Sequence, residues 1–149
     1  MGLRTVAVAL LLSVMAVPLA ACRGPAEVTF AELVAAPARY NGRTVTVEAL
    51  YFHSFETTAL CESLVESTQF PGHLVPTQPL IWLDSGLPVA VFNQLTEETY
   101  ENGPSSWYGK LRIKGVFEYG GKYGHVGGFE YQLRVPVDSA EVELLEWER

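Results

Sequence analysis

The stretch from Tyr108 to Tyr119 constrains the fold more than any other part of the sequence, because apolar and basic residues alternate along it. The apolar positions include Leu111 and Ile113, and the basic ones are Lys110, Arg112 and Lys114. Alternation of this kind has the period of a β-strand with one covered and one exposed face. The pattern therefore predicts a sheet that covers a hydrophobic core, and Gly115 predicts a bulge or sharp bend in the strand.

Turn and breaker residues divide the rest of the chain into short elements. The segment Thr29-Phe30-Ala31-Glu32 has the pattern of a capping box, so we expect a short helix from there to about Ala36. Pro88 suits the first turn of a second helix, which should end near Gly103-Pro104. Proline and glycine between Ser63 and Pro79 predict a long surface loop. Further strands are expected at 45–51, 55–62, 79–84, 129–135 and 141–145.

The N-terminus has the pattern of a secretory signal. Met1-Gly2-Leu3-Arg4 precedes an apolar run from Val6 to Leu19, which is shorter than the roughly 20 residues of a membrane span. The segment Leu19-Ala20-Ala21-Cys22 resembles the lipobox of bacterial lipoproteins, in which the cysteine is acylated and becomes the mature N-terminus. The resemblance implies a lipid anchor on Cys22, on the extracytoplasmic side of the bacterial cell membrane or outer membrane. The alternative is an ordinary cleaved signal that leaves Cys22 unpaired in a secreted protein.

Cleavage after residue 21 of the 149 leaves enough chain for one domain with a hydrophobic core. We therefore divide the sequence into a signal peptide (1–21), a lipidated tether (22–28) and a single domain (29–149). Arg4 is removed with the signal, so the mature part contains nine of the ten Lys and Arg residues and seventeen Asp and Glu residues. This acidic balance makes nucleic acid a poor partner, because basic side chains supply most of the affinity for it.

Cysteine usage excludes a disulfide framework. The sequence has two cysteines, and a lipid on Cys22 leaves Cys61 without a partner. We expect Cys61 to be a small buried hydrophobe on its strand rather than a reactive thiol.

The predicted order of five short strands, with a helix between the third and the fourth, is that of the OB-fold. The segment FAELVAAPARYNGRTVTVEALYF (residues 30–52) resembles the opening of exported bacterial OB-fold-like lipoproteins, and GKLRIKGVFEYGGKYGHVGG (residues 109–128) also resembles that group. The resemblance implies a mainly β chain, folded as a small OB-like Greek-key barrel of about five strands. It would have a short N-terminal helix and a helix between strands three and four. Many such proteins have no assigned activity, so the resemblance transfers no functional residue.

The glycine-rich segment EYGGKYGHVGG, residues 118–128, has two interpretations. It is predicted to be the turn between strands four and five, in which pairs of glycines reverse the chain. The same loop commonly flanks the ligand face of an OB-fold. In that case Tyr119, Tyr123 and His125 would be displayed beside a ligand.

Basic residues concentrate between Lys110 and Lys122, among tyrosines, in an otherwise acidic chain. Aromatic rings stack on flat ligands and cations attract anions, so this region predicts a site for a small anionic ligand or a protein. The candidate ligand-binding residues are Lys110, Arg112, Lys114, Tyr119, Tyr123 and His125. The alternative is a solvated outer strand face, charged to deter edge pairing.

Motifs for catalysis, metals and cofactors are missing from the sequence. His53, His73 and His125 lack metal-ligand spacing, and the glycine-rich segment lacks the Gly-Lys-Ser/Thr end of a phosphate loop. We therefore expect a non-enzymatic binding or scaffolding module at the bacterial cell envelope, without metal or cofactor. The alternative from another class is an envelope hydrolase that uses carboxylates such as Glu118 and Glu130.

Overall fold

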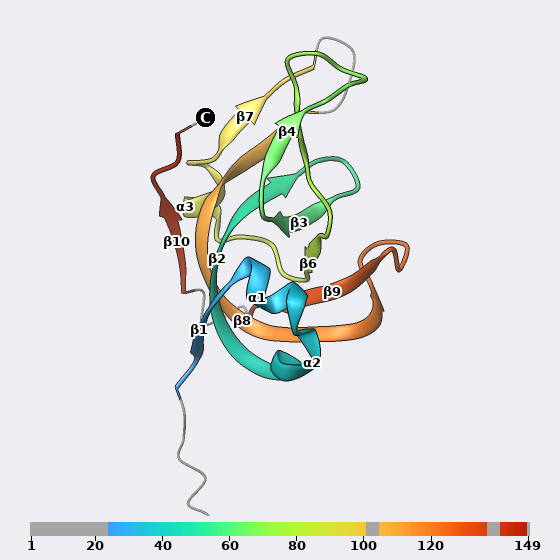
Figure 1. The fold of residues 1–149 in the computed structure, drawn as a ribbon. Coiled ribbons are helices and arrows are strands. Elements are labelled where there is room, and N and C mark those ends of the chain that lie inside the picture. Colours follow the sequence, from blue (N-terminus) through green and yellow to red (C-terminus); the bar gives the residue numbers. More distant parts are fainter. Residues whose placement is uncertain (1–23, 101–104, 137–140, 149) are drawn as a thin grey trace, which may run out of the picture.

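The computed structural model describes residues 24–100, 105–136 and 141–148 (Figure 1). In these ranges the protein is mainly β, with one large mixed sheet, a separate two-stranded sheet and short helices. The strands are β1 (Ala26–Thr29), β2 (Arg43–His53), β3 (Thr58–Cys61), β4 (Leu64–Glu66), β5 (Leu74–Pro76), β6 (Ile81–Leu83), β7 (Thr96–Glu98), β8 (Ser106–Tyr123), β9 (Phe129–Arg134) and β10 (Val142–Leu145). The helices are α1 (Phe30–Ala35), α2 (Pro37–Tyr40) and α3 (Val89–Phe92).

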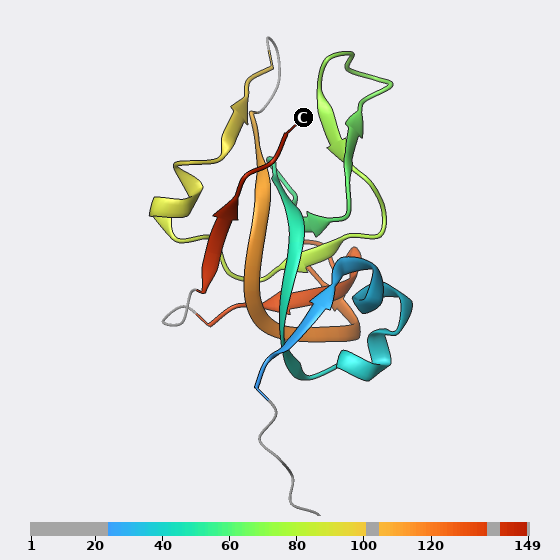
Figure 2. The same ribbon diagram turned by 60° about the vertical axis from the view of Figure 1, so that its left-hand side comes forward.

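Two long, curved strands organise the large sheet (Figures 1 and 2). β2 and β8 pair antiparallel from Arg43 opposite Phe117 to His53 opposite Trp107. β2 also pairs with β3, β3 with β6, β6 with β9, and β9 with β8. Each of these strands therefore pairs with two others of the same set. The β6–β9 pair is parallel and the other four pairs are antiparallel.

The N-terminal helix begins as the sequence predicts. The Thr29 hydroxyl accepts a hydrogen bond from the Glu32 amide at 3.1 Å, and the Glu32 carboxylate accepts one from the Thr29 amide at 2.9 Å. This reciprocal pair is the expected capping box. The residues immediately before it form β1, which pairs parallel with β2 from Ala26 opposite Val45. The ordered sheet thus starts at Ala26, within the segment expected to be a tether.

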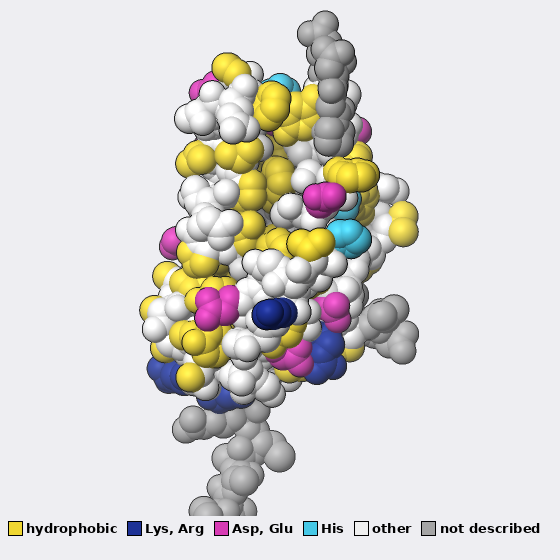
Figure 3. All heavy atoms as spheres, turned by 90° about the vertical axis from the view of Figure 1, so that its right-hand side faces the viewer, with side chains coloured by type: hydrophobic (Ala, Val, Ile, Leu, Met, Phe, Trp, Pro, Cys, Tyr) yellow, Lys and Arg dark blue, Asp and Glu magenta, His cyan; other side chains and the backbone are white. Residues whose placement is uncertain are grey.

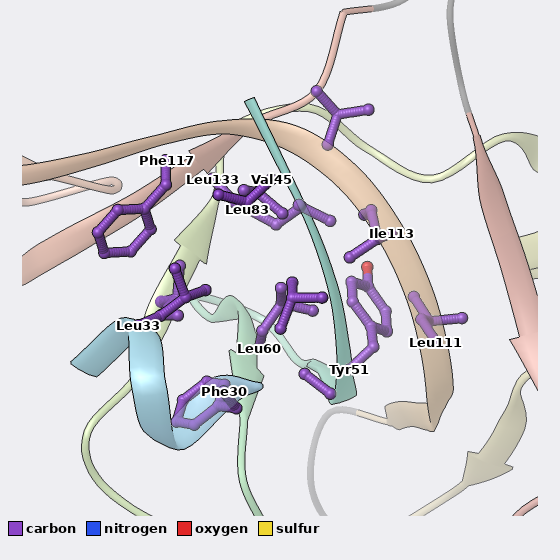
Figure 4. Close-up of a cluster of buried hydrophobic side chains, with 14 of the residues drawn as sticks. Phe30, Leu33, Val45, Tyr51, Leu60, Leu83, Leu111, Ile113, Phe117 and Leu133 are labelled. Atoms are coloured by element: carbon purple, nitrogen blue, oxygen red, sulfur yellow. The ribbon is translucent and has the colours of Figure 1, made fainter. Parts of the chain in front are cut away.

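The core lies between the inner faces of the curved strands, with α1 against one side (Figure 4). Every second residue of β2 and β8 points into it, as the alternating sequence requires. Gly115 is part of this inner row. A Cβ at Gly115 would lie 2.8 Å from the carbonyl oxygen of Arg134, so glycine permits the close approach of β8 and β9. The expected bulge lies instead between Tyr119 and Tyr123.

Two predictions between residues 63 and 103 were wrong. The expected long loop contains the β4–β5 hairpin, in which Leu64 pairs with Pro76. The expected helix from Pro88 is only the four-residue α3, and Thr96–Glu98 then pairs with β8 as β7. In both places the local sequence predicts a strand only weakly. Pairing with a neighbouring strand nevertheless satisfies the hydrogen-bonding groups of the backbone.

The glycine-rich segment is only partly a turn. β8 continues through Gly120 and Gly121 to Tyr123, so this first glycine pair lies in the strand. The chain reverses at Gly124–Gly127, where the amide of Gly127 donates a hydrogen bond to the carbonyl of Gly124. Among the described residues, no helix is long and apolar enough to cross a bilayer.

Candidate functional site

Lys110, Arg112 and Lys114 lie on the outer face of β8, opposite the core. Lys110 Nζ lies 3.4 Å from Glu48 Oε2, and Lys114 Nζ lies 2.9 Å from Glu141 Oε1. The Arg112 guanidinium contacts Glu27 of β1 at 2.7 Å and Glu48 of β2 at 3.6 Å. We call this set the charged face: Glu27, Glu48, Lys110, Arg112, Lys114 and Glu141. An anion would have to displace a carboxylate at each of its cations.

Tyr119 lies elsewhere, at one end of the core. Its ring stacks on Tyr131 at 5.7 Å between ring centroids, and Tyr131 stacks on Phe117 at 6.2 Å. The Tyr119 amide donates a hydrogen bond to the Asn41 side chain at 2.9 Å. Burial raises the pKa of Tyr131, and the nearby Glu130 and Tyr119 add to the effect. Tyr119 therefore has a packing role in this aromatic stack.

Tyr123 and His125 lie at the far end of β8. Tyr123 pairs with Phe129 and folds back over Gly121, while His125 is exposed in the turn between β8 and β9. The structure thus separates the six predicted ligand-binding residues into three places. Lys110, Arg112 and Lys114 stay together on the charged face, but the tyrosines and the histidine do not join them.

A second surface lies beside this turn. The Trp82 and Phe129 rings pack with their centroids 5.1 Å apart, and a Cβ at Gly124 would meet the Phe129 ring at 2.6 Å. Gly124 has a φ of +79°, so both its conformation and its closeness to the ring favour glycine. Val126 in the same turn is 85% exposed, and Phe55 in the loop between β2 and β3 is 82% exposed.

We call these residues, Phe55, Trp82, Gly124, Val126 and Phe129, the loop-flanked face. Both loops project on the right-hand side of Figure 1. On that side hydrophobic side chains are frequent in the upper part, and basic and acidic side chains lie together in the lower part (Figure 3). The sequence analysis missed Trp82, although its position between the inward Ile81 and Leu83 indicates an outward side chain.

The carboxylates of the hydrolase hypothesis are not equivalent. Glu118 accepts hydrogen bonds from Gln132 at 2.7 Å and from Arg134 at 3.1 Å, whereas Glu130 is exposed on β9. Glu118 therefore forms an ion pair with Arg134, whereas Glu130 does not take part in it.

Cys61 and His53 are not among the residues of these two faces. Cys61 is fully buried, and burial raises the pKa of its thiol to about 12. This confirms that Cys61 is buried on its strand, and the raised pKa disfavours the thiolate form in which a cysteine reacts. Burial also lowers the pKa of His53, whose Nδ1 lies 2.9 Å from the Thr58 hydroxyl oxygen. Within the described ranges, no three His, Cys, Asp or Glu side chains converge as metal ligands would.

Two grooves flank β1. The larger, of about 640 Å³, contains Lys110 and Trp147 in its lining, and the smaller, of about 390 Å³, contains Arg112 and Lys114. Both therefore border the charged face.

The chain matches no known protein family, no curated protein and no solved structure. The predicted anchor residue, Cys22, lies outside the described residues.

Proposed function

We propose that this protein is a lipid-anchored, extracytoplasmic OB-like barrel that acts as a non-enzymatic binding or scaffolding module at the bacterial cell envelope. The barrel assignment is supported by the pairing order β2–β3–β6–β9–β8, which returns to β2 through the β2–β8 pair. In an OB-fold the third and fifth strands are parallel neighbours, which corresponds here to β6 and β9. α3 lies in the connection between the third and fourth strands of this order.

The anchor is supported by the sequence Leu19-Ala20-Ala21-Cys22 and its preceding apolar run. β1 begins four residues after Cys22. A lipid on Cys22 would therefore keep the domain close to the membrane surface, without a long stalk.

The loop-flanked face is the proposed binding surface, and the exposure of Phe55 and Val126 is the observation that carries this assignment. Val126 belongs to the turn whose Gly124 approaches the Trp82 ring, and Phe55 belongs to a second loop on the same side of the molecule (Figure 1). Large exposed apolar side chains on one side of a domain form the kind of surface that a protein partner covers. A protein segment suits this surface better than a small anion, because the cations of β8 lie on the charged face and contact carboxylates.

Chemical crosslinking in intact envelopes tests this function. We expect the native protein to form a discrete crosslinked species, and a Phe55→Ser and Val126→Ser double variant to lose it. Val89→Ser is the matched control, because Val89 is 75% exposed on α3 and lies outside the loop-flanked face. If the double variant and the control both kept the crosslinked species, the loop-flanked face would not be the binding surface.

A further inference from the structure

The larger groove is lined by residues of β1, α1 and β2. Figure 2 shows β1 leading into α1 beside β2. β1 pairs with β2 as far as Glu48, and β3 pairs with β2 from Leu50 onward, so the strand neighbouring this edge of β2 changes here. The groove of about 640 Å³ opens at this change. It is lined by Glu27, Val28, Thr29, Phe30, Ala31, Glu32, Glu48, Ala49, Leu50, Glu62, Lys110 and Trp147.

The charge of the groove is strongly unbalanced. Four glutamates line it, with Lys110 as the single basic residue in the lining. Lys110 contacts Glu48, and Arg112 next to the groove contacts Glu27 and Glu48. Glu62 makes no hydrogen bond or ion pair within the described part of the chain. The groove therefore has negative charge that its own cations do not balance.

Apolar side chains also line the groove, among them Leu50 and Trp147. Leu50 is only 7% exposed, and the Trp147 ring packs edge to face on Tyr108 with 5.8 Å between centroids. Tyr108 is almost fully buried, so this contact holds Trp147 against a rigid part of the sheet. A fixed indole next to carboxylates favours an alkyl-ammonium or guanidinium group, which combines a hydrophobic stem with a charge.

We propose that the groove beside β1 binds an extended basic segment of a partner protein. Lys or Arg side chains of this segment lie opposite Glu62, which has no ion-pair partner among the described residues, and one of their stems packs on Trp147. The groove combines apolar and acidic lining, which suits a peptide chain. A second copy of the chain fits poorly, because each mature copy has nine Lys and Arg against seventeen Asp and Glu.

Fluorescence anisotropy with the full-length protein in neutral detergent tests this proposal. The probe is a short labelled peptide in which Lys and Ser alternate around a central Leu, and its Glu counterpart is the control peptide. We expect the Lys peptide to bind, with an affinity that decreases as salt is raised, and the Glu peptide not to bind.

Variants then locate the site. We expect Glu62→Lys to weaken binding of the Lys peptide by about tenfold, and Trp147→Ala to weaken it as well. Glu97→Lys makes the same charge change on β7, outside the groove, and should leave the affinity within about twofold. Glu62 is exposed, so its replacement does not disturb the core. Circular dichroism checks that each variant is folded.

Several outcomes would overturn the proposal. Equal weakening by Glu62→Lys and Glu97→Lys would mean general attraction between opposite charges. Spermine binding as tightly as the peptide would assign the groove to small cations, and no binding at low salt would remove the site. The Phe55→Ser and Val126→Ser variant should bind the Lys peptide normally, so this test stands apart from that of the loop-flanked face.

Discussion

At the level of single residues, Arg112 shows that the basic residues of β8 have carboxylate partners that the sequence alone does not reveal. Its alternation with apolar neighbours correctly placed it on the outer face. The sequence did not show that Glu27 of β1 and Glu48 of β2 would lie across from it, because that depends on the register of two distant strands. Exposed ion pairs of this kind contribute little stability, typically below about 1 kcal/mol each. They do, however, keep the cations of β8 paired with carboxylates.

The burial of Cys61 predicts that the free energy of unfolding decreases at alkaline pH. The thiol has an ordinary pKa of 9.0, and burial raises it to about 12 in the folded protein. The unfolded chain therefore ionises first, so the stability contributed by the neutral thiol is complete below pH 9 and is lost as pH rises toward 12. At pH 10 the loss should be about 1 kcal/mol. Urea unfolding at pH 8 and pH 10 measures it.

The comparison protein is Cys61→Ala, which removes the ionising group and whose cavity cost is the same at both pH values. Its decrease in unfolding free energy between pH 8 and pH 10 should be smaller than that of the native protein by about 1 kcal/mol. Burial also raises the pKa of Tyr51, but this contribution is common to both proteins. Equal decreases in both proteins would contradict the argument.

At the level of elements, prediction succeeded where a local signal coincided with the tertiary arrangement. The Thr29–Glu32 capping box follows from contacts between neighbouring residues. The alternation of Tyr108–Tyr119 follows from a single buried face of the strand. Prediction failed where distant pairing decided the structure. β5 was not predicted because it contains Pro76, which disfavours a strand in the local sequence. Thr96–Glu98 forms a strand because it pairs with β8.

The candidate site shows the same limit. Lys110, Arg112 and Lys114 were correctly grouped, because they share one strand face. Tyr123 and His125 were grouped with them from sequence proximity, but β8 continues farther than predicted and carries them to its far end. The loop-flanked face was missed because Phe55, Trp82 and Val126 are far apart in sequence.

The capping box gives a prediction at this level. Replacing Thr29 with alanine removes the hydroxyl that accepts from the Glu32 amide, so the first turn of α1 loses a cap. We expect the free energy of unfolding to fall by about 1 kcal/mol, measured by urea denaturation. Thr29→Ser keeps the hydroxyl and should retain most of the stability. Equal losses in both variants would show that β1 packing, and not the cap, explains the effect.

At the level of the whole molecule, the domain is acidic and its groove is proposed to bind a basic partner. The mature part, with nine Lys and Arg against seventeen Asp and Glu, is repelled by an anionic membrane surface, so neither face is expected to hold the protein there. In the proposed arrangement the lipid provides the membrane attachment, while the same charge attracts a basic partner. Position and binding would thus depend on separate parts of the chain, Cys22 and the domain that follows it.

Removal of the lipid site tests this separation. We expect the native protein to remain in the membrane pellet through high salt and to be released by detergent, because acyl chains are not screened. A chain whose residues 1–22 are replaced by an ordinary cleavable signal should be soluble and still bind the Lys peptide. Intact mass of the native protein should show an acylated N-terminal Cys22. An unmodified mature N-terminus, or sedimentation of the replaced chain with membranes, would contradict the anchor, since the acidic domain has no electrostatic reason to stay there.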